Sequence, residues 1–547
     1  MKTIRIIAFL TLMLSVIPSF SQERGFFRVY ERDDKSFGPS CAIELSDGSF
    51  IVAANDRSVY NEAWNLEISG ELVKLSSEGE LLRSVPIADE NGHFQIENIF
   101  QHPSEPGMFI GTGMLYDPEG LPGDYYHTVP YLIQFDEELH ITLQTSLCWP
   151  DEYQSPWVGN SRTMLDRLGK LFSVFLCRYE TNGLPQMHRL YAQISTEGEI
   201  EHIVKDTVDL HPQGCSTEAV FEFPDTRQKG LLRQSFVVPG NGTTTPRLYR
   251  LNKIMEAEEV NEIHRFANDT TIYQNSLGQP VIDIQCIYLN DYVKTTVLPL
   301  DDSTLLFALI GDEYLHEWTP DTNIFLLESS AVMFKTDTEG NIQQQYFVEG
   351  SWNDTIESIP ARSFDVTDED AFGHKYIYHC CETEEFTTPY DGPNVMTITK
   401  MTEDFEIVWQ KKYAQPGIYM QPRHLVATAD GGCLVVGVVN RSGQPLGGHH
   451  EIFALKLLPD GTVGTGEITV TDEIFFYPNP ARDVLHLHYP QEMQPTQIEL
   501  YDLQGRLVRT QTSGFESLSM EGLAAGQYVL KVTLENGKVY TDKVVKE

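Results

Sequence analysis

Short runs of alternating apolar and polar residues fill most of the chain, and tight polar turns separate them. Alternation with a period of two predicts β-strands, and Asp-Gly or Glu-Gly between two such runs predicts a hairpin. Clear examples start at Cys41 (CAIELSDGSFIVAA), Thr296 (TVLPLDDSTLLFALIG) and His424 (HLVATADGGCLVVGVV). The pattern therefore predicts an all-β fold built from hairpins.

A second strand-turn-strand pattern follows such hairpins and can be aligned seven times along the chain. Successive copies are 56 to 65 residues apart, except for one gap of 85 residues, which predicts an insertion. Seven four-stranded units cannot bury their apolar faces singly, and stacking them around an axis solves that problem. The sequence thus predicts a seven-bladed β-propeller. The aligned turn positions are Gly79, Leu139, Gly198, Met255, Gly340, Phe405 and Gly461.

The seventh unit lacks a fourth strand after Gly461. The segment FFRVY at 26–30 matches IVWQKKY at 407–413, the outer strand of the sixth unit. We therefore expect the N-terminal strand to complete blade seven and close the ring. The units resemble the DGGYxVVG…VVKLDxxGxxxW repeats of exported Bacteroidetes propellers, most closely in blade seven.

Two kinds of connection are expected at opposite faces of the ring. The first-to-second and third-to-fourth strand turns are short, whereas the other connections are longer, and loops on a rigid scaffold often carry functional groups. The longer connections are expected at 55–70, 114–130, 148–160, 178–189, 259–292, 312–329, 349–362, 382–394 and 440–451. Trp409 is expected in a strand, and the other five tryptophans fall in these loops: Trp64, Trp149, Trp157, Trp318 and Trp352.

Aromatic residues in these loops are the candidate ligand-binding groups. A tryptophan left in water forfeits on the order of 1.5 to 3 kcal/mol relative to burial. The rings therefore either pack the loops down or face a ligand, and both hypotheses stay open. The ligand-binding residues predicted from the densest aromatic and acidic clusters are Tyr125, Tyr126, Trp149, Tyr153 and Trp157.

Catalytic motifs are missing from the sequence, which has no GxSxG, HExxH, P-loop or dinucleotide fingerprint. A carboxylate pair suited to glycoside cleavage could occur among so many acidic residues, but the sequence singles none out. We expect no cofactor and no metal site, with Ca²⁺ at the acidic loop 117–124 as an alternative. The run His449-His450-Glu451 is a weak metal candidate, because adjacent strand side chains point apart.

The net charge of −40 comes from 39 basic and 79 acidic residues. Such a charge repels phosphate backbones and anionic membrane surfaces, so nucleic acid is not an expected partner. The adjacent Cys380 and Cys381 are interpreted as strand residues on opposite faces, with redox or metal chemistry as the alternative. Four further cysteines lie in apolar runs and are expected as buried thiols: Cys41, Cys177, Cys286 and Cys433.

Both ends of the chain indicate export. Residues 1–21 have a basic start, an apolar run too short to span a bilayer, and a small-residue site before Gln22, which predicts a signal peptide. No transmembrane segment is expected. The propeller is predicted at 22–469. Short strands separated by turn signals predict a small Ig-like β-sandwich at 470–547.

The C-terminal motifs, in their order, resemble the type A sorting domain of proteins exported by the type IX secretion system of Bacteroidetes. This resemblance implies passage through the periplasm and the secretion machinery as a partner. It also implies removal of the domain, followed by release or by attachment to surface lipopolysaccharide. The residues that carry the resemblance are Pro478, Asn479, Pro480, Gly505, Gly526 and Lys543.

These observations predict a secreted or cell-surface propeller that binds a glycan or a protein through the long-loop face. The alternative is a carbohydrate-active enzyme, either a glycoside hydrolase or a polysaccharide lyase, with carboxylates near the channel. A structural surface protein without a small ligand is a third hypothesis.

Overall fold

All regular structure in the described part of the chain is β in the computed structural model. Among the residues it describes, no helix is long and apolar enough to cross a bilayer. The described residues are 25–30, 37–60, 66–89, 92–117, 127–147, 157–181, 184–206, 216–235, 247–253, 255–262, 270–274, 280–288, 297–318, 323–348, 356–370, 372–385, 395–414, 418–441, 451–463, 469–470, 475–477, 481, 484–489, 494–515, 517–535 and 537–546.

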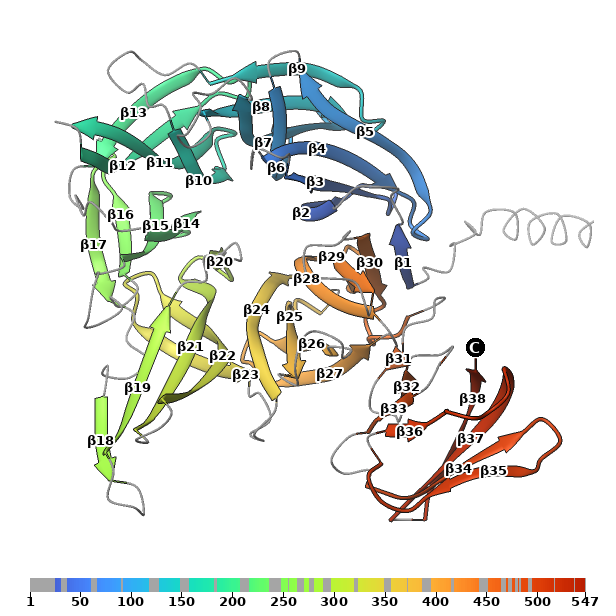
Figure 1. The fold of residues 1–547 in the computed structure, drawn as a ribbon. Coiled ribbons are helices and arrows are strands. Elements are labelled where there is room, and N and C mark those ends of the chain that lie inside the picture. The colour runs from blue at the N-terminus through green and yellow to red at the C-terminus, as the bar shows by residue number, and fades with distance from the viewer. Residues whose placement is uncertain are drawn as a thin grey trace, which may run out of the picture.

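Seven antiparallel blades surround a central axis, which confirms the predicted fold (Figure 1). A short pairing of the outer strand of blade one with the innermost strand of blade two joins these two blades in one eight-stranded sheet. The strands are given from the innermost outwards. Blade one has β2 (Phe37–Glu44), β3 (Phe50–Tyr60), β4 (Leu66–Leu75) and β5 (Leu81–Asp89), and blade two has β6 (Gly92–Gln101), β7 (Met108–Asp117), β8 (His127–Asp136) and β9 (Ile141–Ser146). Blade three has β10 (Trp157–Leu165), β11 (Leu171–Thr181), β12 (Leu184–Ile194) and β13 (Ile200–Asp206), and blade four has β14 (Ser216–Glu222), β15 (Lys229–Ser235), β16 (Arg247–Leu251) and β17 (Ala257–Glu262).

The ring continues in the same order. Blade five has β20 (Val297–Pro299), β21 (Thr304–Trp318), β22 (Asn323–Asp337) and β23 (Ile342–Val348). Blade six has β24 (Ile356–Val366), β25 (Tyr376–Glu385), β26 (Val395–Thr402) and β27 (Ile407–Ala414). Blade seven has β28 (Ile418–Ala427), β29 (Cys433–Arg441), β30 (Glu451–Leu457) and β1 (Phe26–Tyr30).

Strand β1 closes the ring as the outer strand of blade seven. It pairs antiparallel with β30, with Phe26 opposite Lys456 and Tyr30 opposite Ile452. Phe26 packs in the seam between blades seven and one, and Phe27 packs in the seam between blades six and seven. Adjacent residues of one strand thus fill two seams, and the predicted closure is confirmed.

One apolar cluster fills each seam between neighbouring blades. The seam between blades one and two, for example, joins Ile51 and Leu72 to Phe94 and Tyr131. Comparable clusters fill the other six seams in order around the ring. Radial stacking therefore buries both faces of every blade, as the repeat predicts.

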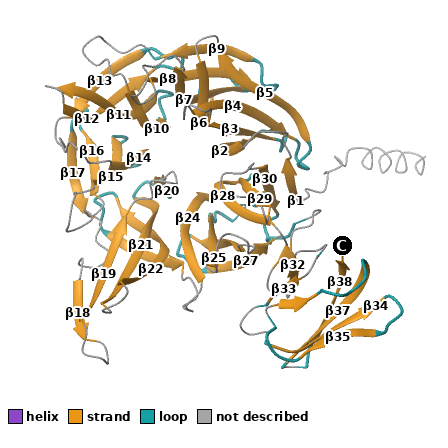
Figure 2. Ribbon diagram, in the orientation of Figure 1, coloured by secondary structure: helices purple, strands orange, loops and turns teal. Residues whose placement is uncertain are grey.

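The seven aligned turn positions all have positive φ, between 59° and 87°. Four of them are glycines, which adopt this conformation without strain. Leu139, Met255 and Phe405 adopt it at a cost of roughly 1 to 2 kcal/mol each. The sequence repeat is therefore a repeat of backbone geometry. We call the face of the ring that carries these tight turns the turn face; the loops and turns between the strands are teal in Figure 2.

A long polar side chain near the end of the third strand links each of five blades to the next blade. Each of these residues stands five positions before the positive-φ residue of its own blade and reaches the third-to-fourth turn of the following blade. The pairs are Lys74 with the carboxylate of Glu138 (2.7 Å), Gln134 with Thr196 O (3.0 Å), Arg250 with Thr338 O (2.8 Å), Lys335 with Glu403 O (3.2 Å) and Lys400 with Pro459 O (3.2 Å).

The predicted insertion is a hairpin, β18 (Thr270–Gln274) and β19 (Pro280–Tyr288), between blades four and five. Strand β19 pairs with residues 310–317 of β21. The expected loops at 259–292 and 312–329 were therefore wrong in part, because strands occupy much of both. Their polar residues suggested loops, but ladder hydrogen bonds join backbone groups whatever the side chains are.

Other strands also run further than the sequence predicts. In blade one, 61–65 separates β3 from β4, and in blade three only 182–183 separates β11 from β12. Trp157 begins β10 and Trp318 ends β21, so Trp409 is not the only tryptophan in a strand. The alternation of apolar and polar residues weakens where a strand extends beyond the packed part of its blade, because neither of its faces is buried there. The ends of these strands were not predicted for that reason.

The C-terminal region forms two facing sheets outside the ring (Figure 1). Before them, β31 (Thr469–Val470) pairs with the outer strand β27 of blade six. The sheets share one apolar core that includes Leu485, Leu500 and Leu530, as the predicted sandwich requires. The first sheet has β32 (Phe475–Tyr477), β33 (Val484–His488) and β36 (Ser517–Ser519), and the second has β35 (Leu507–Gln511), β34 (Pro495–Asp502), β37 (Gly526–Leu534) and β38 (Val539–Lys546).

Candidate functional site

The predicted ligand-binding aromatics stay predictions. Tyr125, Tyr126, Trp149 and Tyr153 lie outside the described residues. Trp157 is the first residue of β10, and only its backbone is described.

The metal candidates also fall mostly outside the described part of the chain. Asp117 ends β7, and the remainder of the acidic loop at 118–124 is not described. His449 and His450 are not described either, and Glu451 begins β30. Within the described ranges, no three His, Cys, Asp or Glu side chains come together as a metal site would require.

The described residues point instead to the central channel. In blades one, two, three, six and seven, the innermost strand makes four residue pairs with its neighbour, counted from the turn face, and then its register shifts. Such a shift is a β-bulge, which re-aims side chains and often lies beside functional sites. The bulges therefore form one level of the channel, and the innermost-strand positions at which the register shifts are Ser40, Glu97, 160–161, 360–362 and Arg423.

Three residues at this level have partly exposed side chains. An innermost strand is covered on both faces by neighbouring blades and is paired along one edge, so its other edge borders the channel. Ser40, Glu97 and Arg423 are all partly exposed. Ser40 Oγ donates a 2.7 Å hydrogen bond to Ile96 O in blade two, and Arg423 donates to the amide oxygen of Gln421. The innermost strands thus carry a carboxylate, on Glu97, and a guanidinium, on Arg423, at this level.

These bulges were not predicted, although the sequence holds a signal for three of them. Proline lacks a backbone donor and is confined within sheets to edge strands and bulges. Pro39 and Pro422 directly precede the bulged Ser40 and Arg423, and Pro360 lies inside the bulge of blade six. These three prolines therefore coincide with the bulges of three innermost strands.

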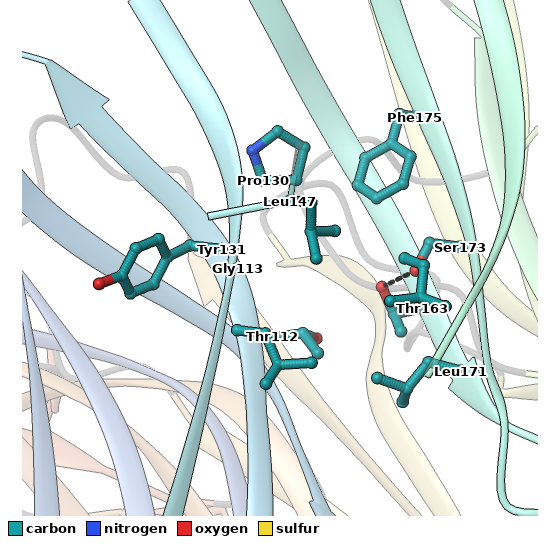
Figure 3. Close-up of a pocket in the computed structure, with 11 residues that line it drawn as sticks. Thr112, Gly113, Pro130, Tyr131, Leu147, Thr163, Leu171, Ser173 and Phe175 are labelled. Atoms are coloured by element: carbon teal, nitrogen blue, oxygen red, sulfur yellow. Dashed lines mark hydrogen bonds between the residues drawn. The ribbon is translucent and has the colours of Figure 1, made fainter. Parts of the chain in front are cut away.

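A small pocket lies in the seam between blades two and three (Figure 3). It has room for about one water molecule, and most of its lining is apolar. Among its lining hydroxyl groups, those of Thr163 and Ser173 are hydrogen-bonded to each other at 2.9 Å, and Thr112 Oγ1 accepts from Asn98 Nδ2 at 3.2 Å. The pocket is a packing void of the seam.

A buried ionic cluster lies between blades three and four. Arg233 donates to the carboxylate of Asp206 at 2.9 Å, and the phenol of Tyr191 donates to the same oxygen at 2.5 Å. The guanidinium also lies over the ring of Tyr249, 4.8 Å from its centroid. Arg233 and Asp206 are almost fully buried, so this cluster joins two blades and does not face the channel.

The described cysteines are buried thiols. Cys41, Cys177 and Cys433 pack in seams, as predicted, whereas the side chain of Cys286 is not described. Burial raises the pKa of Cys433 to about 12, which keeps its thiol protonated and unreactive. Cys380 and Cys381 are successive buried residues of β25, and neighbouring strand positions face opposite sides. The strand interpretation of this pair is confirmed.

Three of the C-terminal motif residues lie in the described part of the sandwich: Gly505, Gly526 and Lys543. Gly505 has φ +76° in the turn between β34 and β35, where Asp502 Oδ1 accepts the N–H groups of Gln504 (3.0 Å) and Arg506 (2.9 Å). Gly526 begins β37, and Lys543 lies on β38, where only its backbone is described. Pro478, Asn479 and Pro480 lie outside the described residues.

Residues 475–547 match the family model described as the secretion system C-terminal sorting domain. The protein carries a type IX sorting domain. The match confirms the resemblance read from the motifs, and it indicates export out of the cell, either to the surface or into the medium. The sorting domain also implies an interaction with the type IX secretion machinery.

Comparison of the whole chain gives only weak likenesses. No curated protein matches its sequence. A Dyadobacter fermentans protein of unknown function is 11% identical, with a TM-score of 0.37 over 81% of this chain and 100% of the other. An α-L-arabinofuranosidase of Fusarium graminearum is 13% identical (TM-score 0.36, 80% and 97%). An α-L-arabinanase of Penicillium chrysogenum is 12% identical (TM-score 0.33, 72% and 95%). The propeller assignment rests on the strand pairings described above.

Proposed function

We propose that the protein is a displayed or released binding propeller, and that a glycan or protein ligand binds at the face opposite the turn face. The observation that supports this is the asymmetry of the ring. The turn face consists of tight turns that are hydrogen-bonded from one blade to the next. The longer connections join strand ends at the other face, where a rigid scaffold can present varied groups.

The channel bulges lie near the middle of the innermost strands. Five innermost strands bulge beyond their fourth pair from the turn face. Glu97 and Arg423 therefore stand about midway along β6 and β28, between the turn face and the ligand face. A polar group of a bound ligand can reach them there, while aromatic loop residues stack on its apolar surface.

Glycan-array and pull-down measurements on the full mature chain would test this proposal. We expect Tyr125→Ala and Trp149→Ala to lower affinity by about 30-fold, corresponding to about 2 kcal/mol, with little change in melting temperature. Phe372→Ala is the matched control, because Phe372 is 84% exposed at a turn of the turn face. Equal loss in the control would contradict the assignment of the face. Release of reducing sugars from a bound glycan would favour the enzyme alternative.

A further inference from the structure

Exposed apolar side chains are concentrated on the sorting domain. Among the described residues, twelve large apolar side chains are markedly exposed, and six of these lie within 475–547. Half of the exposed large apolar side chains thus lie in a small part of the chain. Clusters of exposed apolar groups mark interaction surfaces. The six residues are Val484, Leu503, Leu507, Val508, Val529 and Val539.

Strand register places several of them on one row of the four-stranded sheet. Tyr501 of β34 lies opposite Leu507 of β35 on one side and opposite Val529 of β37 on the other. Directly paired residues share a face. The alternate residues Leu500 and Leu530 are buried in the core, so this row lies on the outer face of the sheet.

A β-bulge widens the row. The register shifts between Leu500 and Tyr501, so that Leu507 and the extra residue Val508 both stand beside Tyr501. Leu507 is 50% exposed, Val508 36% and Val529 38%. Tyr501, Leu507, Val508 and Val529 together form what we call the apolar stripe. The next row carries the ion pair between Glu499 and Lys531 (2.8 Å), which gives the stripe a polar border.

Charge distinguishes this domain from the rest of the chain. Residues 475–547 carry seven basic and nine acidic side chains, a net charge of −2, whereas the whole chain carries −40. A second copy of the chain would bring another −40 and would be repelled, as would an anionic lipid surface. The sorting domain itself can approach a partner without this repulsion.

We propose that the apolar stripe is the surface by which the sorting domain docks on a protein of the secretion machinery, through an apolar patch on that protein. This rests on the sorting-domain assignment and is independent of the ligand proposed for the propeller. Burial of exposed Leu and Val side chains drives such docking. The Glu499–Lys531 pair forms its polar rim.

The test is export of the full chain from a host that has the type IX system. Leu507→Lys and Val529→Lys should each lower the ratio of exported to periplasmic protein by about tenfold or more, as loss of an interface anchor does. Val484→Lys is the matched control, since Val484 is 40% exposed on the other sheet, and it should be exported normally. Melting curves of periplasmic protein should be unchanged, because these positions are exposed.

A chain lacking 475–547 serves as the reference for loss of sorting. If the truncated chain is retained in the periplasm while both stripe variants are exported like the control, the sorting domain is needed for export but the apolar stripe is not its docking surface. If the control is retained as strongly as the stripe variants, the stripe has no special role. If the stripe variants are exported normally but convert a wild-type dimer to a monomer in solution, a second copy covers the stripe, which also overturns the proposal.

Discussion

The phenol of Tyr30 in the closing strand donates a 2.8 Å hydrogen bond to the carbonyl oxygen of Gly79 in blade one. Tyr413, at the matching place in blade six, donates a bond of the same length to Gly461 O in blade seven. The N-terminal strand thus engages the next blade as a regular fourth strand does. Ring closure is therefore continuous at the point where the two ends of the propeller meet.

Removing this hydroxyl should weaken closure. Tyr30→Phe leaves the carbonyl of the buried Gly79 without its partner, which costs about 1 to 3 kcal/mol. We expect a lower melting temperature for the propeller transition by calorimetry. Tyr413→Phe should show a similar loss, and an unchanged melting temperature in both variants would contradict the role given to these bonds.

A methyl group at Gly461 should cost more than one at Gly373, although both have similar positive φ. Any L-residue pays roughly 1 to 2 kcal/mol in this region. At Gly461 the added Cβ would also lie 2.9 Å from Lys411 Cδ and 3.1 Å from Trp409 Cζ2, whereas at Gly373 it meets nothing within 4 Å. Denaturant unfolding of Gly461→Ala and Gly373→Ala measures the difference, and equal losses would show that the crowded turn relaxes freely.

Breaking the buried pair of Arg233 and Asp206 should destabilise blades three and four. Asp206→Ala leaves a guanidinium buried without its carboxylate, at a cost of about 3 to 5 kcal/mol. Replacing both residues together, as Arg233→Met with Asp206→Leu, should recover much of this loss. Calorimetry measures the loss of stability in the two single variants and in the double variant. If the loss in the double variant equals the sum of the single losses, the pair is not coupled.

His379 predicts loss of stability in acid. It is fully buried, its ring nitrogens have no hydrogen-bond partner among the described residues, and burial lowers its pKa from 6.5 to about 4. The unfolded chain takes up a proton below pH 6.5 while the folded chain does not. Unfolding is therefore favoured as pH falls from about 6.5 to 4, by up to about 3 kcal/mol. His379→Leu should flatten this part of the pH–stability curve, and an unchanged curve would disprove it.

Asp365 acts in the opposite direction. Burial raises its pKa from 3.8 to about 6, although its carboxylate accepts the N–H of Ala427 at 2.9 Å. The folded state holds this proton more tightly, so the contribution of Asp365 is greatest below pH 3.8 and is lost as pH rises through 6. We expect the gain in stability from Asp365→Asn, measured against the native chain, to be larger at pH 7 than at pH 4. A variant less stable at pH 7 would show that the ionised carboxylate is favoured.

The sequence alone determined the repeat, the closing strand and the sorting domain. These follow from local rules. Each strand has a period of two, and each third-to-fourth turn has a residue of positive φ. The strand that the seventh unit lacks is supplied by the segment that contains Phe26 and Phe27. Even Leu139 and Phe405, which are not glycines, could be aligned, because the strands on either side keep the register. The apolar pattern predicts seven seams since each blade must bury both faces.

Only the tertiary structure decided how the blades are joined and where the channel is lined. Lys400 and Gln134 look like surface residues in the sequence, yet each reaches a carbonyl more than fifty residues away in the next blade. The level of Ser40, Glu97 and Arg423 depends on register shifts across five separate strand pairs. The apolar stripe of the sorting domain likewise depends on which strands become neighbours. Such relationships link residues distant in the chain, and local periodicity carries no information about them.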